Sequence, residues 1–178
     1  MGPAIAIANL VTRTAWGALP AKARTPQRPE AVRFLVVHYS AMDADEQAAH
    51  RNCAGRVRGI QRYHMTSDQL TPGGASDIGY SWVVCKHGYV FKARGFRVLP
   101  AATGGANSFT QAVCFLGNDS AGRDDVTPKG RAAIREVLAF LERNAPNLEG
   151  VRGHRDFGST TCPGAELYAF VKRLDSEL

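Results

Sequence analysis

A continuous apolar run, RFLVVHYS at residues 33–40, constrains the fold more than any other stretch of this chain. Its β-branched and aromatic residues leave no polar face, which is typical of a strand buried on both sides in a sheet covered by helices. The run ends in polar residues and places His38 near its carboxyl end. Because ligands bind beyond the carboxyl ends of strands in open α/β sheets, His38 is a candidate functional residue.

Three helices are predicted from capping signals and from apolar residues spaced three and four apart. The first covers residues 43–65, with Asp43 as its cap. The second starts at Thr127-Pro128, where threonine is a good cap and proline is tolerated in the first turn. Pro163 is expected to open the last helix directly after Cys162.

Further strands are predicted at 77–85, at 111–117 and near 148–152, with a hairpin that turns at His87-Gly88. Strands and helices therefore alternate, which favours an α/β fold: a central mixed β-sheet flanked by helices in a single domain. Residues 1–32 are expected to form an N-terminal extension and connector that pack on this domain, which occupies 33–178. A chain of 178 residues matches one domain of ordinary size.

Charge narrows the choice of partner. Lys and Arg number 22 against 16 Asp and Glu, a formal net charge of +6, which favours an anionic partner. The charges are scattered and no nucleic-acid-binding motif accompanies them, so nucleic acid is disfavoured, and an anionic lipid and an anionic cell-wall polymer stay open as partners. No apolar run approaches the ~20 residues of a membrane helix, and no signal peptide is recognised at the N-terminus.

The segment GHRDFGSTTCPG at 153–164 is predicted to be a loop that exposes His154 and Cys162 to a ligand. With His38 these residues offer two imidazoles and one thiol, the ligand set of a catalytic zinc site whose fourth position is open. The start of the following helix would also favour the thiolate form of Cys162. On residue types alone, a loop cysteine beside an ion-paired His-Arg-Asp turn remains an alternative.

Other histidines and cysteines are weaker candidates. His50 and Cys53 lie three residues apart on the first predicted helix and could share a metal ion. No second pair of donors is near them in the sequence, so a packing role is favoured. Cys85 and Cys114 stand within apolar runs, where a free thiol usually serves as a small buried hydrophobe. All four cysteines are expected to be reduced.

Six blocks in order resemble the zinc amidase and peptidoglycan-recognition domain family, which includes phage endolysin amidases. They are RTAWG (13–17), VVHYS (36–40), IQRYHM (60–65), SDIGYSWVV (76–84), GYVFKARG (88–95) and GHRDFGSTTCPG (153–164). The resemblance covers nearly the whole chain, from Arg13 to Leu174. It implies a catalytic domain at 33–178 and Zn²⁺ bound by His38, His154 and Cys162.

The resemblance also implies roles for other residues. Tyr80 of DIGY and Thr160 match catalytic positions, where they would donate hydrogen bonds to the developing oxyanion or to the zinc-bound water. Asn107 matches a substrate-groove asparagine, and His64 of Y-H-M faces either the groove or the core. Asp77 and Asp156 are both candidates to hold the tautomers of the zinc histidines.

Three departures from the family pattern are visible. Ala102 stands where the family often has histidine, and the strand at 111–117 lacks the carboxylate of some cytosolic members. The Gly-Trp pair that animal members use for diamino-acid peptides is missing from LTPGGAS. The sequence therefore leaves the stem-peptide preference open.

The implied activity is peptidoglycan hydrolysis: zinc-activated water cleaves the amide between N-acetylmuramic acid and L-alanine. Two alternatives stay open, a non-catalytic peptidoglycan-binding module and a cytosolic amidase that recycles anhydromuropeptides. Recognition-only members commonly lack the thiol found here at Cys162, which favours the hydrolase. We expect a monomeric, endolysin-like enzyme made in the cytoplasm that acts on the cell wall, or one secreted by an unrecognised route.

Overall fold

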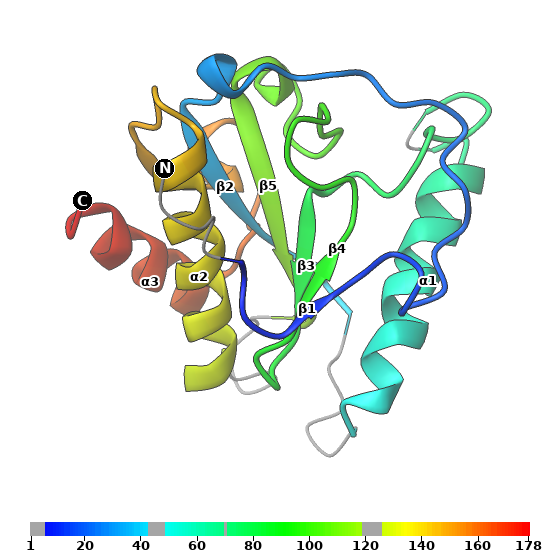
Figure 1. The fold of residues 1–178 in the computed structure, drawn as a ribbon, viewed down its shortest axis with the longest axis horizontal. Helices are drawn as coiled ribbons and strands as arrows, with labels where there is room; N and C mark the ends of the chain where they lie inside the picture. Colours follow the sequence, from blue (N-terminus) through cyan, green and yellow to red (C-terminus); the bar gives the residue numbers. More distant parts are fainter. Residues whose placement is uncertain (1–5, 43–48, 70, 119–125) are drawn as a thin grey trace.

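The computed structural model describes residues 6–42, 49–69, 71–118 and 126–178, and in them the chain forms one mixed six-stranded sheet between helices (Figure 1). The strands are β1 (Leu10–Val11), β2 (Phe34–Tyr39), β3 (Trp82–Val84), β4 (Val90–Lys92), β5 (Thr110–Phe115) and β6 (Gly150–Gly153). The α-helices are α1 (Arg51–Thr66), α2 (Pro128–Asn144) and α3 (Ala165–Asp175). This confirms the predicted α/β class.

The sheet has the order β1-β4-β3-β5-β2-β6. Strand β2 pairs in parallel with β5 and β6, and β3 is parallel to β5 but antiparallel to β4. The predicted run at 33–40 is thus an interior strand with neighbours on both sides. Because β2 and β6 are parallel neighbours, their carboxyl ends meet at one edge of the sheet.

Two hydrophobic cores lie on opposite faces of the sheet. Leu35 and Val37 of β2 pack into the core beneath α2 and α3. Side chains alternate along a strand, so His38 points to the other face, where α1 packs. The core beneath α1 is built on β3, β4 and β5, through Val83, Phe91 and Cys114. Helix α1 therefore packs over β3, β4 and β5 rather than over β2.

The structure corrects some predicted boundaries and confirms others. Helix α1 begins at Arg51, and the predicted cap Asp43 lies outside the described residues. Thr127 caps α2 as predicted, because its Oγ1 accepts a hydrogen bond from the Gly130 N–H at 3.1 Å. Helix α3 begins at Ala165 rather than at Pro163. The short connection at 85–89 joins β3 to β4 as the predicted hairpin.

The N-terminal segment contributes to the sheet and to its core. Leu10 and Val11 pair with Val90 and Phe91 at the edge of the sheet. Trp16 is fully buried, and its Nε1–H donates to the Lys92 carbonyl oxygen at 2.8 Å. Among the described residues, no helix is both long enough and apolar enough to cross a bilayer.

Candidate functional site

The three predicted metal ligands come together although they are far apart in sequence. His38 is the penultimate residue of β2, His154 follows β6, and Cys162 lies in the loop before α3. Their ligand atoms all lie within 4.8 Å of one another. Cys162 Sγ is 3.8 Å from His38 Nδ1, and the ring centroids of His38 and His154 are 4.5 Å apart. The parallel pairing of β2 with β6 explains this convergence.

A threonine that sequence reasoning did not assign to the site fixes the orientation of His38. Thr103 is fully buried, and its Oγ1 lies 3.2 Å from His38 Nε2. When Nε2 carries the proton it donates to this hydroxyl, and the Nδ1 lone pair then faces Cys162. Burial and the neighbouring His154 lower the pKa of His38, so the ring is neutral at pH 7 and can act as a ligand.

Cys162 is held as a buried thiol. The Tyr39 N–H donates a hydrogen bond to its Sγ at 3.4 Å, but burial dominates and raises the pKa of Cys162 to about 11. The expected stabilisation of a thiolate by the start of α3 is therefore wrong. The helix begins three residues after the cysteine, and the effect of a helix terminus is confined to its first turn.

This donor set fits a borderline-soft cation. The bond lengths of a tetrahedral zinc site place its ligand atoms roughly 3.5–3.8 Å apart, and the Cys162–His38 separation of 3.8 Å agrees. Burial also lowers the pKa of His154, which keeps that ring neutral. His38, His154 and Cys162 supply three ligands, so a cation held here would keep a position for water or substrate.

Tyr80 stands beside this cluster as predicted. Its ring centroid is 5.4 Å from that of His38. Burial, with smaller contributions from Cys114 and Cys162, raises the pKa of Tyr80 well above its ordinary value, so the phenol keeps its proton at neutral pH. Cys114 of β5 is a neighbour of this phenol, which the sequence did not reveal.

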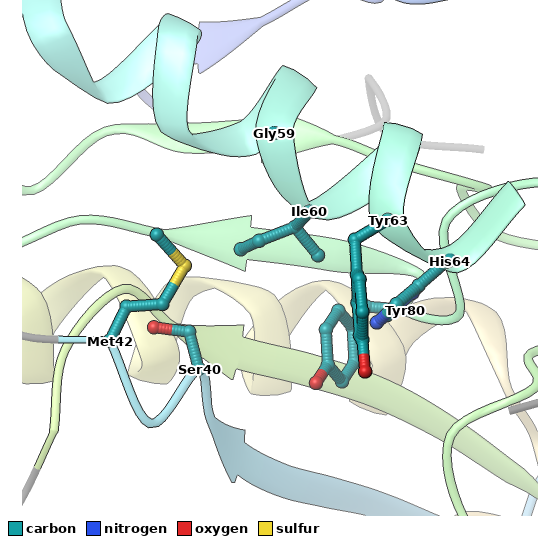
Figure 2. Close-up of a pocket in the computed structure, with 7 residues that line it drawn as sticks. All are labelled: Ser40, Met42, Gly59, Ile60, Tyr63, His64 and Tyr80. Carbon is teal, nitrogen blue, oxygen red and sulfur yellow. The ribbon is translucent and has the colours of Figure 1, made fainter. Parts of the chain in front are cut away.

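A pocket of about 430 Å³ opens next to Tyr80, between α1 and the end of β2 (Figure 2). Its lining consists of Ser40, Met42, Gly59, Ile60, Tyr63, His64 and Tyr80. His64 therefore faces the groove, which settles the two alternatives left open by the sequence. Its Nδ1 accepts a hydrogen bond from the Gly79 N–H at 2.9 Å, so the proton of the neutral ring is on Nε2 and is available to a ligand.

Only glycine fits at position 79 of the DIGY segment, because a side chain there would collide with its neighbours. A Cβ at this position would lie 2.6 Å from the Ala101 carbonyl oxygen and 3.4 Å from His64 Nδ1. We therefore expect Gly79→Ala to destabilise the fold by about 1–3 kcal/mol in urea unfolding, and to weaken ligand binding by displacing His64. Gly55→Ala in α1 is the matched control, since its nearest contact would be 3.7 Å away and alanine favours a helix. A Gly79→Ala protein as stable as wild type would contradict this account.

Asn107 and Thr160 have local partners. The Asn107 side-chain oxygen accepts hydrogen bonds from the N–H groups of Ala102 and Thr103, at 3.0 and 2.9 Å, and so holds the loop that carries Thr103. Thr160 is exposed, and its Oγ1 accepts from the Cys162 N–H at 3.2 Å, which leaves its hydroxyl proton available. The roles predicted for both residues toward substrate stay predictions.

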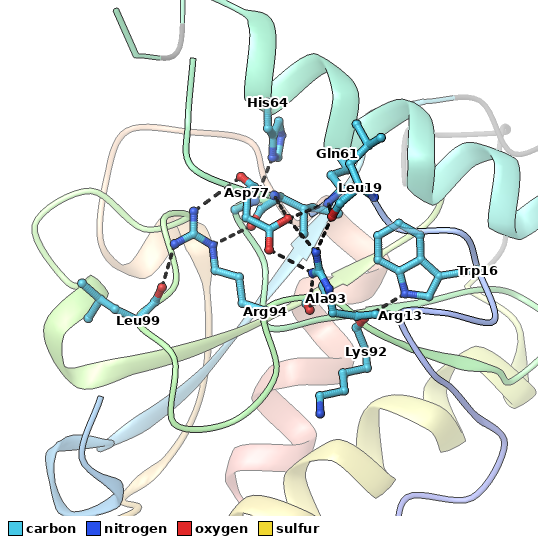
Figure 3. Close-up of polar contacts among 12 residues, drawn as sticks. Arg13, Trp16, Leu19, Gln61, His64, Asp77, Lys92, Ala93, Arg94 and Leu99 are labelled. Carbon is cyan, nitrogen blue, oxygen red and sulfur yellow. Dashed lines mark hydrogen bonds and ion pairs between the residues drawn. The ribbon is translucent and has the colours of Figure 1, made fainter. Parts of the chain in front are cut away.

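Neither aspartate proposed to support the zinc histidines does so. Asp77 is buried, bonds Gln61 at 2.7 Å and pairs with Arg13 at 2.9 Å (Figure 3). Asp156 accepts from the Gly153 N–H and from the Tyr168 hydroxyl. Both predictions are wrong, because sequence proximity to the motif did not reveal that Thr103 occupies this place at His38.

Comparison with known proteins agrees with this geometry. The profile of the N-acetylmuramoyl-L-alanine amidase family matches residues 27–165. The chain belongs to this family. It is 32% identical to human N-acetylmuramoyl-L-alanine amidase over 163 residues, which are 90% of the chain but only 27% of that protein. It is 31% identical to peptidoglycan recognition protein 1 of Bos taurus over 180 residues, 97% of the chain and 87% of the relative.

Solved structures of peptidoglycan recognition proteins share the fold of this amidase-family chain. Drosophila PGRP-SD is 25% identical with a TM-score of 0.80, covering 92% of this chain and 93% of that one. A chain from the complex of tracheal cytotoxin with the ectodomains of PGRP-LCa and PGRP-LCx is 27% identical to this chain, with a TM-score of 0.80. The match covers 92% of this chain and 95% of that one. The family therefore includes both amidases and proteins named for recognition.

Proposed function

We propose that this chain is a zinc-dependent peptidoglycan hydrolase that cleaves the amide between N-acetylmuramic acid and L-alanine. The observation that carries the proposal is the convergence of His38, His154 and Cys162 within 4.8 Å beside a groove. A non-catalytic recognition protein has no need for a buried thiol and two neutral imidazoles aimed at one point. Delivery to the cell wall, as an endolysin or by secretion, stays a prediction from the sequence.

Zinc bound by these residues would supply an acidified water and polarise the amide carbonyl. The chain prepares the ligands for it. Burial keeps both histidines neutral, and Thr103 directs the Nδ1 lone pair of His38 toward Cys162. The Cys162 thiol, whose pKa burial raises to about 11, would have to release its proton to bind a cation, because metal binding is coupled to ligand deprotonation.

Tyr80 is proposed to stabilise the negative charge that develops on the carbonyl oxygen. Its phenol remains protonated at neutral pH and lies beside His38, so its hydroxyl can donate to the substrate. Thr160 is proposed as a second donor, because its oxygen is fixed by the Cys162 N–H while its proton is uncommitted. Donors placed in advance cost little reorganisation at the moment of reaction.

The groove is proposed to hold the peptide side of a muropeptide. Ile60, Tyr63 and Met42 provide apolar surface, and His64 offers its Nε2–H as a hydrogen-bond donor. Tracheal cytotoxin, the ligand in the PGRP-LCa and PGRP-LCx complex, is a monomeric peptidoglycan of diaminopimelic acid type. Tracheal cytotoxin is therefore of the same chemical class as the muropeptide proposed as the substrate of this chain.

Tyr80→Phe is expected to slow turnover by about a hundred- to a thousandfold, the usual effect of removing one oxyanion donor. Zinc content and the unfolding midpoint should stay as in wild type, because phenylalanine keeps the ring beside His38. Steady-state rates on soluble muropeptide, together with metal analysis, measure both. Tyr168→Phe is the matched control, since its hydroxyl bonds Asp156 outside the groove. An unchanged rate for Tyr80→Phe would end the proposed role.

The proposal is tested by product analysis. Purified peptidoglycan incubated with the zinc-loaded protein should gain free alanine amino groups without new reducing sugar ends, as identified by mass spectrometry. Chelation should abolish release, and added zinc should restore it. Binding without release would identify a recognition module, and new reducing ends would identify a glycosidase. A strong preference for soluble anhydromuropeptides over intact wall would identify a recycling amidase.

A further inference from the structure

A second group of metal-ligating side chains lies outside the groove. His50, Cys53 and Cys85 place their ligand atoms within 4.8 Å of one another. The sequence offered only the first two, three residues apart at the start of α1, and no further donor near them. Folding brings Cys85 to this pair from the end of β3. A packing role was favoured for His50 and Cys53 because the sequence showed no further donor near them, and Cys85 now supplies that donor.

The geometry of this second cluster suits a tetrahedral site. Cys85 Sγ lies 3.9 Å from His50 Nδ1, close to the roughly 3.5–3.8 Å between ligands of a tetrahedral zinc ion. His50 is held in place by stacking on Tyr89, with ring centroids 3.5 Å apart and an interplanar angle of 17°. The sulfurs of Cys53 and Cys85 are both buried and belong to free cysteines. Two thiols that lie together away from solvent suit a thiophilic cation.

The hairpin between β3 and β4 fixes the position of Cys85. The Cys85 N–H donates to the Tyr89 carbonyl oxygen at 3.1 Å, and the Cys85 carbonyl oxygen accepts from the Gly88 N–H at 2.9 Å. The same hairpin carries Tyr89, on which the His50 ring stacks. The hairpin therefore holds Cys85 and the His50 ring next to each other.

The cluster is accessible from one side. His50, His87 and Tyr89 line a cavity of about 480 Å³ that also contains Lys129 and Glu136. The His87 ring centroid lies 6.1 Å from that of His50, so a fourth ligand can come from His87 or from water. The cavity therefore gives a cation access to the cluster at His50.

We propose that His50, Cys53 and Cys85 form a second, structural metal site for a thiophilic divalent cation such as Zn²⁺, separate from the His38 site. Bound there, the ion would join the start of α1 to the β3–β4 hairpin. Because α1 forms one wall of the groove, this link would hold the wall against the sheet. The site shares no residue with the proposed catalytic centre.

Metal content measured by mass spectrometry after zinc loading and dialysis tests the proposal on the full chain. We expect two zinc ions per wild-type chain, one in Cys162→Ser, one in His50→Ala and none in the double variant. His50 is only partly buried, and its side chain makes no capping hydrogen bond to the start of α1, so His50→Ala should fold. Cys114→Ser is the matched control: this buried thiol belongs to neither cluster and its replacement should leave two ions.

Cobalt substitution gives a second readout that does not depend on activity. Cobalt-loaded Cys162→Ser should show strong thiolate-to-cobalt absorption from Cys53 and Cys85, and the further change Cys85→Ser should reduce it by about half. Wild type that holds one zinc ion, all of it lost in Cys162→Ser, would overturn the proposal. So would an intact mass lower by two hydrogens with a peptide linking Cys53 to Cys85, because those sulfurs would then form a disulfide. Failure of the catalytic proposal alone would leave the His50-dependent ion in place.

Discussion

Cys162→Ser is expected to lose the zinc ion proposed for the His38 site and to lower the rate of the proposed peptidoglycan hydrolysis by about a thousandfold or more. A serine hydroxyl keeps the hydrogen bond from the Tyr39 N–H, but it deprotonates far less readily than a thiol and is a poor ligand for a borderline-soft cation. Without the ion, an amide must be attacked by ordinary water with no polarised carbonyl, which forfeits several kcal/mol of transition-state stabilisation.

Metal analysis and product release from purified peptidoglycan measure the two effects together. The fold should survive, because Cys162 is replaced by a smaller side chain in a loop, so the variant should still unfold in a single cooperative transition. A serine variant that still hydrolyses wall at the wild-type rate would exclude Cys162 as a ligand. A variant that keeps its zinc but loses activity would instead place the thiol in the chemistry itself.

Asp77→Ala is expected to lower the free energy of unfolding by about 3–5 kcal/mol, the usual cost of removing one partner of a buried ion pair. Asp77 is 1% exposed, and its carboxylate bonds Arg13, Gln61 and the Ile78 N–H (Figure 3). Its carbonyl oxygen also accepts from Arg94 at 3.4 Å. Alanine would leave the Arg13 guanidinium facing an uncharged cavity.

Urea unfolding at neutral pH measures this loss. Glu149→Ala is the matched control, since it removes a carboxylate paired with Arg33 on the surface, where both side chains are about half exposed. Exposed pairs contribute about 0–1 kcal/mol, so the control should be nearly as stable as wild type. Equal stability of the two variants would show that the Asp77 network does not join the N-terminal segment to α1 as the contacts suggest.

The elements of the fold were largely predictable because their signals are local. The apolar run at 33–40, the capped start of α2 at Thr127 and the hairpin at His87-Gly88 each depend on neighbouring residues alone. The expected start of α3 at Pro163 was wrong by two residues, since Gly164 intervenes before the helix. A proline tolerated in a first turn does not compel the helix to begin there.

The candidate metal ligands could also be named from the sequence, because His38 lies near the end of a buried strand and Cys162 stands in a motif. The residues that contact the functional side chains could not be named from the sequence. Thr103 at His38, Cys114 at Tyr80 and Arg13 at Asp77 are contacts between segments that only strand order and register bring together. A shift of one residue in register would turn each side chain to the other face of the sheet.

The sequence by itself determined the family, the alternation of strands and helices, and the residue types available for chemistry, because these depend on local pattern and composition. Tertiary structure alone decided which of these residues meet. It set His64 against Gly79 at the groove, excluded Asp77 and Asp156 from the metal centre, and brought Cys85 to His50 and Cys53. The physical reason is that side-chain contacts follow from the packing of distant segments, on which local propensity has no bearing.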